Sequence, residues 1–453
     1  MAAAFAILST LSLSAQNSAQ AALEQQFQAA ISAQEHGDLK RAESLLADLH
    51  KKHPGILAVD ESLGMLLAGE DRVAEALPLL EAAVREAPKN AAAHANLGAA
   101  YYNLHRNGEA LTAFESAVRL NPKNLAAQQS LGQVLLELHK PGRAAEAYAA
   151  ALALDPANTD LMQARAQALA DNGQLDAARA QLTAMPGLDQ SAAAQSLLGD
   201  IEEKRGDFLA AAHHYELAAQ LDPSEANAWA LGVELLRHWT FDAAVREFEG
   251  ATTRFPHSTR MRLGLGAAYF GNASYAQAVP VFADLLEADP ANAFYAEMLG
   301  MACSAVTQQP RPRCAALLAY AQAHPADAKA AVYAAAGILQ GQPTDDQTRE
   351  ARTLLERAIA ADPRLPDAQY QLGLLMQNQA DWSGSVPHLE AAIALQPALA
   401  QAHYRLALAY WRMGRKQEGQ EQMELQKKYS AQEKEDLDKR LRQITIFLVD
   451  GHK

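Results

Sequence analysis

A 34-residue period runs through most of this 453-residue chain and limits what the chain can fold into. Proline, alanine and glycine each return in columns at this spacing, which is the signature of a repeat architecture. The prolines are Pro54, Pro88, Pro122 and Pro156, the alanines Ala42, Ala76, Ala110 and Ala144, and the glycines Gly64, Gly98 and Gly132. After one shortened unit, the glycine column resumes at Gly199, Gly232, Gly266 and Gly300. Columns in register indicate one repeated structural unit.

Each unit reads as a pair of helices, as residues 91–124 illustrate. Leu97, Tyr101 and Leu104 follow the i, i+4, i+7 spacing of one helix face. A second helix with similar spacing follows a short turn and ends before Pro122. Proline punctuates each unit because it lacks an amide hydrogen and disfavours helix in the residue before it. The repeated unit is therefore predicted to be a helix-turn-helix.

This pattern resembles the tetratricopeptide repeat family. The motif residues are Leu97, Gly98, Tyr101, Ala110, Phe114, Ala117 and Pro122 in one unit, and Leu131, Gly132, Ala144, Tyr148, Ala151 and Pro156 in the next. The resemblance implies an all-α, right-handed solenoid or superhelix of about twelve units. Their expected first residues are Leu23, Leu57, Ala91, Leu125, Thr159, Ala192, Glu225, Thr259, Ala293, Ala328, Pro366 and Ala400.

The units differ in regularity along the chain. We expect eight regular units over residues 23–292, two irregular units over residues 293–365, and two regular units over residues 366–433. Proline-containing connections interrupt the irregular units and predict a break in superhelical curvature near residues 305–345, about which two sub-arrays would move. A charged capping helix is expected over residues 430–443, followed by a β-branched tail over residues 444–453. The tail either pairs with a partner, lies in a groove, or docks on the last helix.

The N-terminus carries a candidate export signal over residues 1–21. Residues 2–15 are uncharged and are followed by Ala19-Gln20-Ala21, the pattern of a signal peptide cleaved near Ala21. No lysine or arginine precedes the apolar run, so a frayed terminus rich in alanine and serine stays open as the alternative. The expected location is periplasmic or secreted, and otherwise cytoplasmic. No later stretch is apolar enough to predict a membrane span.

Cys303 and Cys314 are the two cysteines of the chain. They flank the proline-rich turn of the ninth unit, where antiparallel helices would bring them within reach of a disulfide. In an exported protein we expect a bridge, whereas two small buried thiols are the alternative for a protein that stays in the cytoplasm.

Charge and motifs argue against several functions. The chain has 39 basic and 53 acidic residues, a net charge of −14, which opposes binding to nucleic acid or to anionic membranes. It lacks the common metalloprotease, hydrolase and phosphate-loop motifs. The fourteen histidines read as ordinary surface or turn residues, with His105 and His139 at a turn position where glycine is usual. We therefore expect no enzyme activity, no cofactor and no metal site.

The resemblance implies that the first helices line a concave face on which a protein or peptide partner lies. Residues expected to be exposed there, and to contact the partner, are Asn96, Tyr102, Gln133, Trp229, Phe270, Tyr370, Tyr404, Arg405, Trp411 and Arg412. Packing between repeats is the alternative role for the aromatic members. The expected function is a non-catalytic, exported binding scaffold. The alternative is an assembly or regulatory subunit of an envelope, secretion or glycan-modifying machine whose catalytic part is a separate chain. The sequence does not indicate the oligomeric state.

Overall fold

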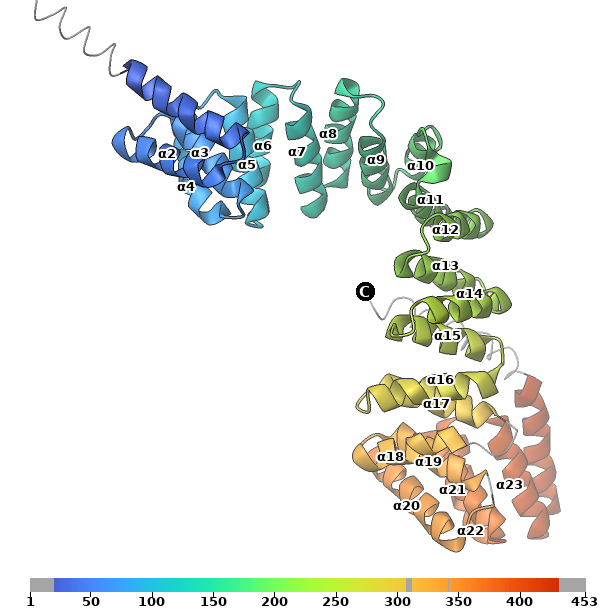
Figure 1. Ribbon diagram of the computed structural model, residues 1–453. Helices are drawn as coiled ribbons and strands as arrows, with labels where there is room; N and C mark the ends of the chain where they lie inside the picture. Colours follow the sequence, from blue (N-terminus) through green and yellow to red (C-terminus); the bar gives the residue numbers. More distant parts are fainter. Residues whose placement is uncertain (1–19, 307–311, 341, 432–453) are drawn as a thin grey trace, which may run out of the picture. The chain divides into compact units, whose positions relative to one another are not determined.

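The computed structural model (Figure 1) describes residues 20–306, 312–340 and 342–431. Within these residues every regular element is a helix, so the predicted all-α solenoid fold is confirmed, while the number of repeats stays a prediction. The candidate signal peptide, nearly all of the expected capping helix and the tail fall outside the described residues. No helix of the described ranges combines the length and the apolarity needed to cross a membrane.

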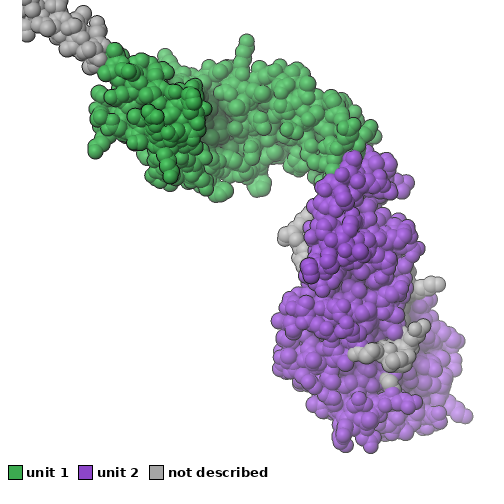
Figure 2. Space-filling view, in the orientation of Figure 1, with its two compact units in different colours: residues 1–205 green, residues 206–453 purple. Residues whose placement is uncertain are grey.

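The chain divides into two compact units at residue 205 (Figure 2), and the break in curvature expected near residues 305–345 stays a prediction. The first unit holds the helical residues 20–35, α2 (Leu39–Lys52), α3 (Leu57–Gly69), α4 (Val73–Glu86), α5 (Ala91–Asn103), α6 (Asn107–Leu120), α7 (Leu125–Glu137), α8 (Pro141–Leu154), α9 (Thr159–Asp171), α10 (Leu175–Thr183), a 3-10 turn (Leu188–Gln190) and α11 (Ala192–Arg205).

The second unit continues the alternation of first helices, with odd labels, and second helices, with even labels. It holds α12 (Phe208–Leu221), α13 (Glu225–Arg237), α14 (Phe241–Arg254), α15 (Thr259–Gly271), α16 (Tyr275–Ala288), α17 (Ala293–Ala305), a 3-10 turn (Pro312–Ala315), α18 (Ala316–Ala323), α19 (Ala328–Leu339), α20 (Asp345–Ala361), α21 (Pro366–Asn378), α22 (Trp382–Leu395), α23 (Ala400–Arg412) and the helical residues 416–431.

Caps and turns explain where the helices begin and end. Side chains of Asn90, Asn124 and Asn158 accept hydrogen bonds from backbone amides in the first turns of α5, α7 and α9. The turn between the two helices of a pair needs a left-handed residue, which Gly173 supplies with φ of 76°. His105 and His139 hold the same conformation at φ of 56° and 53°. These histidines therefore occupy a backbone position that favours glycine.

Glycines on the first helices let an aromatic ring of the second helix pack against the backbone. A Cβ added to Gly98 would lie 2.9 Å from Phe114 Cδ1, and one added to Gly132 would lie 2.7 Å from Tyr148 Cε1. These distances are shorter than ordinary contacts between carbon atoms. At Gly98 and Gly132 the glycine column of the sequence is therefore a packing requirement within the helix pair.

Successive pairs are joined by contacts between each second helix and the next first helix, and first helices also touch one another. A tyrosine–glutamate hydrogen bond recurs across this boundary. In each case, a tyrosine of a first helix donates to a glutamate of the preceding second helix, 20 residues earlier. The pairs are Tyr101–Glu81 (2.9 Å), Tyr269–Glu249 (2.6 Å) and Tyr410–Glu390 (2.7 Å).

The ninth pair departs from this regularity more than expected. Its second helix, α18, has only eight residues, against fourteen in α16. Gly300 of its first helix is covered by Tyr333 of α19, which would lie 2.3 Å from an added Cβ. The irregularity expected for this unit therefore includes a shortened second helix.

Candidate functional site

In the first unit, the predicted contact residues form a row of polar side chains on the first helices. Asn96 of α5 donates through Nδ2 to Glu61 Oε1 of α3 at 2.9 Å, and lies 3.3 Å from Met65 Sδ. Asn96 is half-buried. Its amide therefore links neighbouring repeats as well as reaching the surface.

Tyr102 continues this row from α5 to α7. Its hydroxyl donates to Glu137 and accepts a hydrogen bond from Gln133 Nε2 at 2.8 Å. Asn107 Nδ2 donates to the other oxygen of Glu137 at 2.9 Å. The hydrogen bond to Glu137, together with burial, raises the pKa of Tyr102. The structure thus brings Tyr102 and Gln133 together, with Gln133 exposed.

In the second unit, Trp229 is half-buried between repeats. The Arg260 guanidinium of α15 lies 4.2 Å from the centre of its ring, and the ring meets Phe248 edge-on at 5.9 Å. Burial lowers the pKa of Arg260. An arginine over a tryptophan face is a favourable cation–π pair. Trp229, which was expected to be exposed, is therefore partly covered by the next repeat.

Two residues expected to be exposed are in the core. Phe270 is 8% exposed and packs edge-on against Tyr275 at 5.2 Å. Tyr370 is 9% exposed in a cluster with Leu389 and Leu406. The expectation of exposure was wrong for both, because neighbouring helices cover this side of α15 and α21. Phe270 and Tyr370 therefore pack between helices, which was the alternative role for the aromatic residues.

The remaining predicted residues gather on α23. Tyr404 and Trp411 are 40% and 37% exposed, and Met413 in the following turn is 41% exposed. Arg405 lies beside Tyr404, and the Arg412 guanidinium lies 5.4 Å from the Trp382 ring. In the described part of the chain, neither arginine forms an ion pair. These residues, Tyr404, Arg405, Trp411, Arg412 and Met413, are called the α23 surface below.

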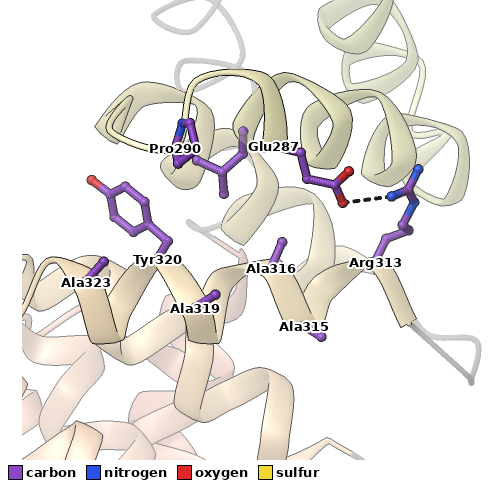
Figure 3. Close-up of a pocket in the computed structure, with 9 residues that line it drawn as sticks. Glu287, Pro290, Arg313, Ala315, Ala316, Ala319, Tyr320 and Ala323 are labelled. Carbon is purple, nitrogen blue, oxygen red and sulfur yellow. Dashed lines mark hydrogen bonds and ion pairs between the residues drawn. The ribbon is translucent and has the colours of Figure 1, made fainter.

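A hollow that sequence reasoning missed lies between α16 and α18 (Figure 3). Its volume is about 560 Å³, within the usual range for ligand pockets. Small residues of α18, including Ala316 and Ala319, form one wall, and Tyr320 stands at one end. At the other end, Arg313 pairs with Glu287 at 2.8 Å. The run of alanines and the short helix are the signals that point to it.

Cys303 and Cys314 are joined in a disulfide, with an S–S distance of 1.94 Å and a Cα–Cα distance of 6.0 Å. Both residues are buried, at 4% and 8% exposed. The bridge ties the end of α17 to the 3-10 turn before α18, and it borders a second hollow of about 340 Å³ that Tyr333 also lines. The ninth pair is therefore held by a covalent bond where its second helix is short.

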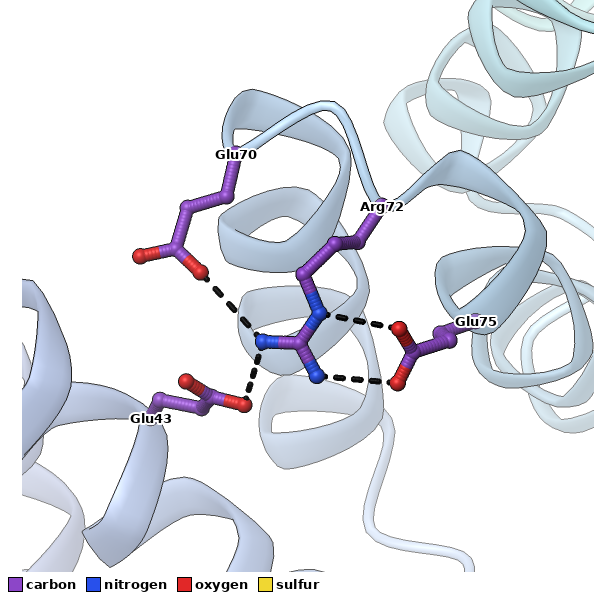
Figure 4. Close-up of polar contacts among 4 residues, drawn as sticks. All are labelled: Glu43, Glu70, Arg72 and Glu75. Carbon is purple, nitrogen blue, oxygen red and sulfur yellow. Dashed lines mark hydrogen bonds and ion pairs between the residues drawn. The ribbon is translucent and has the colours of Figure 1, made fainter.

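A charged cluster in the first unit fixes the turn between α3 and α4 (Figure 4). Arg72 donates to both carboxylate oxygens of Glu75 at 2.9 and 2.8 Å, to Glu43 at 2.7 Å and to Glu70 at 3.4 Å. The hydrogen bond from Arg72 lowers the pKa of Glu75, and the carboxylates raise that of Arg72, Glu75 most of all. Because Arg72 donates to three carboxylates on both sides of the turn, this cluster has a structural role.

Comparisons with known proteins give the same family from several parts of the chain. Two sequence models, each described as tetratricopeptide repeat, match it. One matches residues 67–134 and 135–201, and the other matches residues 27–91, 230–293 and 370–419. No curated protein sequence matches.

Solved structures with similar helical folds include three with a TM-score of 0.38. Naa15/Naa10 bound to HypK-THB is 18% identical, over 89% of this chain and 68% of that one. PilF of Pseudomonas aeruginosa is 20% identical, over 45% of this chain and 94% of that one. YrrB, described as a TPR protein with an unusual peptide-binding site, is 23% identical, over 41% of this chain and 95% of that one.

Proposed function

Because the chain belongs to the tetratricopeptide repeat family, we propose that it is a non-catalytic scaffold that binds a protein or peptide through the first helices of its repeats. Repeats of this kind expose long surfaces and need no reactive group, since binding depends on the side chains that each first helix presents.

The α23 surface is the single observation that carries this proposal. Tyrosine, tryptophan and arginine are the residues that dominate binding energy at protein interfaces. Tyr404 and Trp411 stay more than a third exposed although most aromatic residues of the first helices are buried or half-buried. Arg405 and Arg412 place two positive charges beside them, which favours an acidic partner and fixes its orientation.

The proposal includes export of the protein from the cytoplasm. It is supported by the uncharged N-terminal segment and by the bridge between Cys303 and Cys314, because disulfides persist in oxidising compartments. A role as an assembly or regulatory subunit of an envelope, secretion or glycan-modifying machine is the second candidate. The identity of the bound partner separates it from a free-standing scaffold.

The test begins with a photo-crosslinking amino acid in place of Tyr404 in the full chain, expressed in its native cells. A matched probe replaces Leu209, which is 88% exposed on the second helix α12. We expect position 404, and not position 209, to capture a defined partner that mass spectrometry identifies. Equal capture at both positions would contradict a specific surface.

Binding of the purified partner is then compared between the native chain and a Trp411→Ala/Arg412→Ala variant. Loss of two anchor residues should weaken the complex by about thirtyfold or more, the size of a typical hot spot. Leu209→Ala is the control and should bind normally. Unchanged affinity in the double variant, with an unchanged melting temperature, would refute the α23 surface as the binding site.

A further inference from the structure

The second helix of the ninth pair, α18, packs on its first helix differently from a regular second helix. In the pair of α5 and α6, Phe114 of the second helix packs on Gly98 of the first. In the ninth pair, the ring that packs on Gly300 of α17 is Tyr333, which belongs to the following helix α19. α17 therefore packs mainly on α16 and α19, and it has few contacts with α18.

The bridge between Cys303 and Cys314 ties α17 to the turn that precedes α18. Cys303 is the eleventh residue of α17, the position at which Tyr101 and Tyr269 bind a glutamate 20 residues earlier in the chain. The residue 20 positions before Cys303 is Ala283, whose side chain accepts no hydrogen bond. A covalent bond within the pair therefore stands where α5 and α15 form a hydrogen bond to the preceding pair.

The other attachments of α18 differ between its two ends. At the beginning, Arg313 pairs with Glu287 (Figure 3) and with Asp284 of α16, but these side chains are 44%, 56% and 47% exposed. Exposed ion pairs contribute little to stability, because water screens them. At the end, Arg357 of α20 donates to the backbone oxygen of the buried Ala321 at 2.6 Å. The beginning of α18 therefore depends on the bridge, whereas its end is held by neighbouring helices.

A hollow leads to the bridge. Both cysteines line the second hollow, whose volume of about 340 Å³ lies within the usual range for small-molecule sites. Gly337 of α19 also lines this hollow and is exposed, and a Cβ added to it would meet nothing within 4 Å. The hollow is therefore open at Gly337, and a small dithiol has a route to the two sulfur atoms.

We propose that the Cys303–Cys314 bridge is a redox-sensitive switch, whose reduction by a dithiol releases residues 312–319 from the array. A thiolate of the dithiol attacks one sulfur of the bridge, forms a mixed disulfide and displaces the other cysteine, which takes up a proton. The second thiolate of the reductant then closes a disulfide within the reductant and frees the first cysteine, which is protonated in turn. Two electrons pass from the dithiol to the bridge.

Release changes the hollow between α16 and α18. Arg313, Ala315 and Ala316 lie at one end of this hollow (Figure 3), and all three belong to the released residues. The eight residues of α18 are too few for a helix that is stable without packing, so its first turn unfolds when the bridge opens. α17 and α19 contact each other directly, so the array stays continuous. The redox state of the surroundings thereby sets whether this end of the hollow is closed.

Hydrogen exchange of the full chain, measured before and after reduction by dithiothreitol, tests the release. Amides of residues 313–319 should exchange about thirtyfold faster or more in the reduced chain, because a bridge across a loop of this length suppresses opening by at least this factor. Amides of α17 and α19 should change little. Alkylation and mass measurement report how many chains are reduced, and peptides from α6 in the first unit report equal exchange conditions.

A Cys303→Ser/Cys314→Ser variant is the control for the reductant itself. Its residues 313–319 should exchange as fast as in the reduced native chain, with or without dithiothreitol. Exchange of these residues that is unchanged by reduction of the native chain overturns the proposal. Equal acceleration across α17, α18 and α19 also overturns it, because the bridge would then hold the whole pair and not the beginning of α18.

Two variants of Gly337 test the route to the bridge. Gly337→Leu places a larger side chain in the second hollow and should slow reduction by dithiothreitol severalfold, whereas Gly337→Ala is the matched control and should not. The rate is followed by alkylation of the freed thiols at several dithiothreitol concentrations, and it should rise in proportion to that concentration. Equal rates in the two variants, or a rate that is independent of the dithiol, would show that reduction waits for unfolding and would refute attack through the hollow.

Discussion

Replacement of Gly232 by alanine probes the packing that holds the helix pairs together. A Cβ at this position of α13 would lie 2.4 Å from Phe248 Cζ, more than 1 Å closer than the optimal carbon–carbon separation of about 3.5–4.0 Å. The ring has no room to retreat. Gly264 of α15 also lies against it, since an added Cβ there would lie 2.3 Å from Phe248 Cε1, and the ring is 0% exposed.

The magnitude depends on two opposing effects. Overpacking of a closed core costs about 1–3 kcal/mol, and a fully buried ring in close contact with two glycines belongs at the upper end. Alanine in place of glycine in a helix interior stabilises by about 1 kcal/mol. The net destabilisation is therefore about 2 kcal/mol. Gly250→Ala in α14 is the matched control, because nothing lies within 4 Å of the added Cβ, and it should stabilise by about 1 kcal/mol.

Hydrogen exchange followed by mass spectrometry measures both variants in the full chain. Peptides from α13 to α15 report the opening of this region without requiring that the whole array unfold at once. A loss of about 2 kcal/mol should speed exchange by about thirtyfold in Gly232→Ala, whereas Gly250→Ala should slow it. Adding Phe248→Leu to Gly232→Ala should recover part of the loss. Exchange that shifts in the same direction in both glycine variants would refute the packing argument.

Three further predictions concern hydrogen bonds, pH and the disulfide. Tyr410→Phe removes the hydrogen bond to Glu390 and should lower the free energy of unfolding in urea by about 0.5–1.5 kcal/mol. In the native chain the pKa of Tyr410 is raised to about 12, which ultraviolet titration measures. The stabilisation by this tyrosine should therefore be complete below pH 10 and lost as pH rises toward 12. Arg72 lowers the pKa of Glu75, so this pair should stabilise the first unit above the ordinary glutamate pKa and lose that effect as pH falls below it, and Glu75→Gln should flatten the acid limb of the melting curve. Cys314→Ser opens a loop of 11 residues and should lower the stability of the second unit by about 2–3 kcal/mol under oxidising conditions, with no effect once the native chain is reduced.

The helix positions could be predicted from the sequence because their causes are local. Asparagine caps and prolines mark the helix ends, and α5 and α7 begin at Ala91 and Leu125, the residues expected from the period. The glycine column also has a local cause, the ring that approaches Gly98. Features that depend on one pair of neighbouring residues can therefore be predicted from spacing alone.

The burial of Phe270 and Tyr370 was not predictable in this way. Helix periodicity indicates which side of a first helix a residue occupies, but the covering side chains belong to other helices. The hollow beside α18 has a similar origin, since a helix of eight residues replaces one of fourteen. Non-local contacts are the reason that sequence patterns placed the surface only in part.

Phe248 has one further consequence, which concerns the order of the repeats. Its ring needs glycine at the sixth position of the following first helix, where Gly264 stands. That position holds Asn96 in α5 and Met298 in α17. Exchanging whole repeats would preserve the backbone period and yet place one of these larger side chains against the ring. The boundary after α14 is therefore compatible with the repeat that begins at Thr259 and not with the repeats that begin at Ala91 or Ala293. Side chains at such boundaries thus specify the linear order of the repeats.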